Sequence, residues 1–137
     1  MTLSTSVIDR KDRAVKASYI YLSLSILCMV FGLIYGEYSH GVYSRFMIYA
    51  FMFPLVGGAL PFLTLYIIPK IPYPGKITRD IYHCGIATIT IGSLVRGALN
   101  IYGTVNPMDK IYGYVAVVLV AAATVMYTVS LFTKKKI

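Results

Sequence analysis

Charged residues are scarce in this chain. Only 13% of its 137 residues are Asp, Glu, Lys or Arg, about half of the roughly 25% found in soluble domains. Hydrophobic residues make up 58% of the chain, and the mean hydropathy is +0.71. A soluble fold of this size has too much surface to hide so much apolar sequence. The composition therefore excludes an ordinary water-soluble domain and predicts an integral membrane protein.

Motifs that carry chemistry are absent as well. The two cysteines, Cys28 and Cys84, lie in separate apolar stretches, without the paired spacing of a disulfide framework or a metal site. The sequence contains no phosphate-binding loop, dinucleotide fingerprint, zinc-protease motif or kinase signature. We therefore predict that the protein is not an enzyme and has no catalytic residues, no metal and no cofactor. No motif ties the chain to a known family.

Acidic residues are the rarer charges, with 5 against 13 basic residues and a net charge of +8. Such an excess fits either nucleic-acid binding or membrane orientation, and the position of the charges decides between them. Most basic residues fall in three segments that would share one side of a membrane: Arg10, Lys11, Arg13, Lys16, Lys70, Lys76, Arg79, Lys134, Lys135 and Lys136. The positive-inside rule places this side and both termini in the cytoplasm. No nucleic-acid role is needed, and contact with anionic lipid head groups is a further hypothesis.

Four apolar segments, at about 17–36, 46–68, 81–102 and 111–133, are each close to the ~20 residues that cross a bilayer. Backbone groups in lipid must be paired internally, so the segments are predicted to be helices. Short connections force neighbouring helices to run antiparallel, which predicts a compact four-helix bundle. The chain is thus interpreted as one all-α, multi-pass domain of the cell membrane over 17–133. Residues 1–16 form a cytoplasmic basic segment with an interfacial helix, and 134–137 a basic tail.

One charged residue, Arg96, falls well inside a span. A cation at that depth needs a partner, a water-filled cavity or a route to the interface. At helical spacing it shares a polar stripe with Tyr82, Thr90, Ser93 and Asn100, which we expect to face the bundle interior. Two interpretations stay open. In the structural interpretation, Arg96 extends to the outer head groups or pairs with Glu37. In the functional interpretation, it binds an anion or a polar head group.

The segment 36–45 is the second polar feature, because it gathers Glu37, His40 and Arg45 among serines and tyrosines. Together with Arg96, Ser93 and Asn100 from the third helix, these residues are the candidate ligand-binding set, at a pocket near the outer face. The alternative is a solvated loop.

The middle of the second span carries Pro54, Gly57, Gly58 and Pro61. Each proline removes one helical hydrogen bond, so the freed carbonyls need other partners. The segment is either a kink for close packing or a hinge that faces a ligand. Small residues in the first helix (Ser25, Cys28, Gly32, Gly36) and in the third (Gly85, Gly92, Gly97) predict packing faces, within the chain or at a homodimer seam.

The leading functional hypothesis is a non-enzymatic membrane module that binds or passes a small polar or anionic species. The alternative is a structural or accessory subunit of a larger membrane complex. A haem- or quinone-binding redox subunit is a third hypothesis. His40 and His83 are predicted on opposite sides of the membrane, so one haem between them is geometrically poor. The sequence names no substrate, oligomeric state or partner.

Overall fold

The computed structural model describes the backbone of residues 2–68 and 70–136, and the side chains of these residues from 8 onward. In the described residues, four helices are long and apolar enough to cross a membrane: Ile8–Tyr38, Arg45–Ile67, Lys76–Ile101 and Asp109–Lys136. The all-α class is therefore confirmed, and the four helices have the length and apolar composition that the predicted spans require.

The first helix, α1 (Thr2–Tyr38), is longer than its apolar part. The sequence suggested a separate interfacial helix before the first span, but the backbone continues through the basic segment without a break. The reason is local, because no proline or glycine interrupts the chain before Gly32.

The second span is a chain of short helical pieces. It consists of α2 (Arg45–Ile48), the 3₁₀ turn η1 (Tyr49–Phe51), α3 (Met52–Pro54), the π-helical turn η2 (Leu55–Ala59) and α4 (Leu60–Ile67). Pro54 and Pro61 flank the π turn, and neither has an N–H to continue a regular ladder. The interruption expected from these prolines is present, in the form of one π turn rather than a sharp break.

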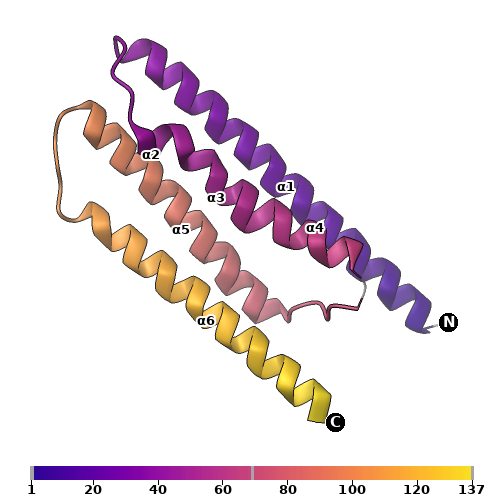
Figure 1. Cartoon of the computed structure of the whole chain (residues 1–137). Helices are drawn as coiled ribbons and strands as arrows, with labels where there is room; N and C mark the ends of the chain where they lie inside the picture. The colour runs from indigo at the N-terminus through magenta and orange to yellow at the C-terminus, as the bar shows by residue number, and fades with distance from the viewer. Residues whose placement is uncertain (1, 69, 137) are drawn as a thin grey trace.

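The last two spans are regular helices, α5 (Lys76–Ile101) and α6 (Asp109–Lys136). Asp109 opens α6 and three lysines close it, which complements the helix dipole at both ends. The structure has two ends (Figure 1). We call the one with both termini and residues 70–75 the basic end, and the one with residues 39–44 and 102–108 the loop end.

The four spans lie in a row rather than in a closed bundle (Figure 1). Helix α1 packs on the second span, the second span packs on α5, and α6 makes its extensive contacts, along the described chain, with α5 alone. Short connections make sequential neighbours antiparallel, but they do not bring the fourth helix back to the first. The compact four-helix bundle predicted from the sequence thus takes the form of an open row of helices.

Small residues let the helices of this row approach closely. The buried side chain of Met47 in α2 lies between Gly32 of α1 and Gly97 of α5. Gly85 and Gly92, on another face of α5, lie against α6. The predicted small-residue faces thus pack within the chain, and α5 has one for each neighbour.

Candidate functional site

The irregular second span is held by side-chain hydroxyls from both neighbouring helices. From α1, Ser18 donates to the carbonyl of Ala59 and Ser25 to that of Phe51, each at 2.9 Å. From α5, Ser93 donates to the carbonyl of Phe46 at 2.7 Å. Backbone carbonyls inside an apolar slab need such partners wherever the helical ladder is irregular.

The fourth hydroxyl of this kind belongs to Tyr82 of α5, which donates to the carbonyl of Gly57 at 2.5 Å. In a regular helix this carbonyl would accept from residue 61, and Pro61 has no N–H to donate. Tyr82 therefore replaces the hydrogen bond that the proline removes. The next residue, Gly58, lies against the ring of Tyr21, where a Cβ would come within 2.1 Å of a ring carbon. The Pro54–Pro61 segment is thus tightly packed on two sides.

Near the basic end, His83 belongs to an aromatic cluster. Its Nδ1 is hydrogen-bonded to the hydroxyl of Tyr21, and its ring stacks on Phe62 with centroids 5.3 Å apart. His40 lies at the loop end, in a turn where its backbone is left-handed at φ 55°. The two histidines are therefore at opposite ends of the fold, and the absence of a haem stays a prediction.

Arg96 is paired with a residue that the sequence analysis did not consider. Its Nε lies 3.3 Å from the Oδ2 of Asp109 at the start of α6. Its guanidinium carbon lies 4.1 Å from the ring centroid of Phe46, a cation–π contact. Glu37 is an exposed residue in the last turn of α1. The predicted Arg96–Glu37 clamp is wrong, because α6 brings a carboxylate to Arg96 from the other side of α5.

The remaining candidate residues divide into two groups. Ser93 donates to the Phe46 carbonyl, and Asn100 donates to the hydroxyl of Ser44 at 3.4 Å. The polar stripe of α5 thus faces the second span as predicted, but these two side chains connect helices. His40 and Arg45 are exposed, like Glu37. The structure does not gather the six candidate residues into one pocket.

A cavity of about 680 Å³ does adjoin Arg96, between the second span and α6. Its polar or charged side chains near the loop end include Arg96, Asp109, Lys110 and Ser93. Phe46 lies beside Arg96 at the same end, and the residues further along the cavity are apolar: Phe53, Ile89, Val117 and Val118. We call it the loop-end cavity. The sequence analysis left Asp109 and Lys110 out of the candidate site because they precede the fourth apolar segment. The connection between α5 and α6 is short, however, so both residues had to lie close to the end of α5.

Two further cavities lie next to the loop-end cavity, along α5 and between the second span and α6. The middle cavity, of about 620 Å³, shares Phe53, Ile89 and Val117 with the loop-end cavity. The basic-end cavity, of about 350 Å³, shares Tyr82 with the middle one. The open row of helices therefore leaves a groove whose floor is α5 and whose walls are the second span and α6.

In comparisons with known proteins, no family model, curated protein or solved structure matches the chain. The function is therefore argued from this geometry.

Proposed function

We propose that the chain is a non-enzymatic membrane module that binds an anionic amphiphile in the loop-end cavity. The observation that carries the proposal is the position of Arg96, whose side chain is 38% exposed while the partner carboxylate of Asp109 is 7% exposed. Lys110 lines the same cavity. Two cations and one carboxylate leave this end of the cavity with a net positive charge, which favours an anionic group.

The apolar walls favour an amphiphile over a small hydrated anion. The hydroxyl of Ser93 already donates to the Phe46 carbonyl, so a small anion would lose water and gain few hydrogen bonds. An alkyl chain can lie against Phe53, Ile89 and Val117 without leaving a polar group of its own unpaired. The proposal thus narrows the small polar or anionic species expected from the sequence to one with a tail, long enough to extend into the middle cavity.

The orientation is proposed from the charges. With the basic end in the cytoplasm, as the positive-inside rule indicates, both termini are cytoplasmic and the loop-end cavity lies in the outer half of a cell membrane. The Pro54–Pro61 segment then lies beside the middle cavity, where Gly57 is a lining residue.

The test uses oleate as the probe and oleyl alcohol, which has the same chain without the charge, as its partner. We expect oleate to raise the unfolding temperature of the protein in neutral detergent more than oleyl alcohol does. The paired variant Arg96→Gln with Asp109→Asn removes the exposed guanidinium that would contact the anion, without leaving a buried carboxylate alone and without changing the net charge of the cavity. Lys110→Gln removes the second cation and lowers that net charge. We expect either variant to reduce the difference between the two probes.

The matched control is Arg45→Gln, which removes a cation from the same end but outside the cavity. It should leave the response to oleate unchanged. Inorganic phosphate should have no effect at concentrations where oleate does. If phosphate stabilised the protein as well as oleate, a small-anion site would replace the amphiphile. If oleate and oleyl alcohol acted equally on the unmodified chain, the proposal would be abandoned.

A second function, as an accessory subunit, is favoured by one observation. Helix α6 has only Ala116 and Ala123 buried, and it rests on α5 alone among the described spans. A second copy or another membrane protein that covered its free face would complete the bundle. The test is to produce the chain alone in a foreign host. Degradation of the chain in the membrane, together with no response to oleate, would favour the accessory function over the binding function.

A further inference from the structure

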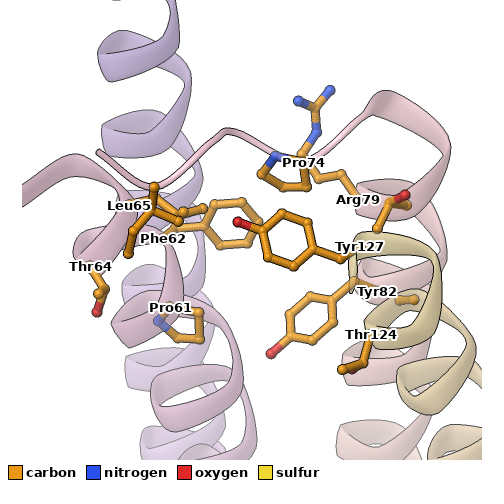
Figure 2. Close-up of a pocket in the computed structure, with 12 residues that line it drawn as sticks. Pro61, Phe62, Thr64, Leu65, Pro74, Arg79, Tyr82, Thr124 and Tyr127 are labelled. Carbon is orange, nitrogen blue, oxygen red and sulfur yellow. The ribbon is translucent and has the colours of Figure 1, made fainter. Parts of the chain in front are cut away.

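The basic-end cavity is built differently from the rest of the groove. Two prolines, Pro61 and Pro74, and the rings of Phe62, Tyr82 and Tyr127 form much of its wall (Figure 2). Its volume of about 350 Å³ lies within the range of small-molecule sites. Rings and prolines have few accessible rotamers, so the cavity has a fixed shape before any ligand enters.

Four of the five hydroxyl groups that line this cavity donate elsewhere; the fifth belongs to Thr78, in the first turn of α5 next to Arg79. Tyr127 donates to the carbonyl of Pro72 at 2.8 Å, and Tyr82 donates to that of Gly57. Thr64 and Thr124 donate to carbonyls of their own helices, each at 2.8 Å. The inner wall therefore offers a ligand little beyond apolar contact.

A cation lies at the mouth of the cavity. Arg79 lines it, and its guanidinium points away from the rings of Tyr82 and Tyr127, beside Pro74 (Figure 2). The guanidinium carbon is 5.3 Å from the ring centroid of Tyr73 in the connecting segment. Lys70 and Lys76 flank this segment and are exposed. The mouth thus presents the positive charge of Arg79 beside an apolar interior, while Lys70, Lys76 and the carboxylate of Asp80 are exposed nearby in the sequence.

The connecting segment forms the edge of the mouth, and the Tyr127 hydrogen bond to Pro72 ties it to α6. This tie joins the second span, α5 and α6 around one cavity. The cavity is therefore a built feature of the fold, since it needs the rigid segment, the tyrosine and the small side chain of Ala123, which is 2% exposed.

We propose that the basic-end cavity is a specific site for an anionic phospholipid, with one acyl chain in the cavity and the head-group phosphate held by Arg79. A charged phosphate at the mouth matches the guanidinium of Arg79, and a hydrocarbon chain matches an interior that is mostly apolar. A basic residue near a membrane surface contributes about 1 kcal/mol of attraction to anionic lipid. This site is separate from the loop-end cavity and does not depend on the function proposed for it.

The experiment measures lipid retained by the full chain in native mass spectrometry, after purification in neutral detergent. Phosphatidylglycerol and phosphatidylcholine with identical chains are offered in equal amounts. We expect preferential retention of phosphatidylglycerol. Arg79→Gln should weaken that preference about fivefold, which corresponds to loss of about 1 kcal/mol. Lys135→Gln removes the same charge at the same end, outside the cavity, and should change retention much less.

A second pair of variants tests the chain within the cavity. Thr124→Phe places a ring into the cavity from an exposed position of α6, and should abolish retention of both lipids while all charges remain. Thr128→Phe adds the same ring one turn further along α6, outside the cavity lining, and should retain lipid normally. Glycerol phosphate, a head group without chains, should not displace the bound lipid.

Three outcomes would overturn the proposal. Equal retention of the two lipids by the unmodified chain would remove the preference for an anionic head group. Undiminished retention by a folded Thr124→Phe variant would remove the acyl chain from the cavity. Displacement by glycerol phosphate would make the site one for a free phosphate group. The paired Arg96 and Asp109 variant should bind phosphatidylglycerol normally, so failure at one cavity is distinguishable from failure at the other.

Discussion

The hydroxyl of Tyr82 donates a hydrogen bond to the carbonyl oxygen of Gly57, the acceptor that Pro61 leaves without its helical donor. Tyr82→Phe should therefore leave a polar group poorly paired in an apolar environment. We expect the free energy of unfolding to fall by about 1 kcal/mol, the scale of single hydrogen bonds in membrane proteins. Denaturation in mixed micelles measures it. Tyr19→Phe, at a position 66% exposed, is the control and should have no effect.

Close approach at Gly97 yields a second prediction. A Cβ there would lie 2.9 Å from the backbone nitrogen of Met47, and backbone atoms cannot turn aside as a side chain can. Gly97→Ala should destabilise the fold by about 1–3 kcal/mol through overpacking. Gly113→Ala is its counterpart in α6, where a Cβ meets nothing within 4 Å. That change should be neutral or stabilise by about 0.5–1 kcal/mol, because alanine favours helix. Equal effects of the two changes would contradict the packing described here.

The ion pair of Arg96 predicts an order of stabilities. Arg96→Gln alone leaves the nearly buried carboxylate of Asp109 without its cation, and we expect a loss of about 1–2 kcal/mol. Adding Asp109→Asn should restore part of that loss, since no unpaired charge remains. Thermal unfolding of the single and double variants checks this order. Glu37→Gln should leave stability unchanged, and a large effect there would restore the clamp that the structure rejects.

The orientation of the chain is open to direct measurement. In a variant without native cysteines (Cys28→Ala, Cys84→Ala), a cysteine at Thr104 samples the loop end and one at Gly75 samples the basic end. With the basic end cytoplasmic, a membrane-impermeant maleimide should label intact cells at position 104 and not at position 75. Labelling should reach position 75 after the membrane is opened. The reverse pattern would invert the topology and with it the placement of both cavities.

The sequence predicted the helical spans well because hydrophobic length alone defines them. It also located the irregular part of the second span, since Pro54 and Pro61 act on their own backbone whatever surrounds them. The partners of the freed carbonyls could not be predicted. Which face of α5 brings Tyr82 opposite Gly57 depends on the register between two helices, and no pattern within either helix sets that register.

The same limit explains the candidate site. Arg96 was correctly identified as a cation that needs a partner. Two carboxylates, Glu37 and Asp109, were both expected on the side of the membrane where the helix of Arg96 ends. Choosing between them requires knowing that α6 lies beside α5 while α1 lies beyond the second span. The groove was unpredictable for a related reason, because it exists only where the row of helices stays open.

That openness also bears on how the molecule resists mechanical force. Helix α1, the second span and α5 are connected by hydroxyl–carbonyl bonds along their length, through Ser18, Ser25, Tyr82 and Ser93. Helix α6 is attached to the others mainly by packing against Gly85 and Gly92, by one ion pair and by the Tyr127 hydrogen bond. Pulled by its carboxyl end from a membrane, the chain should yield in two stages, with α6 extracted first and a three-helix remnant resisting to a higher load.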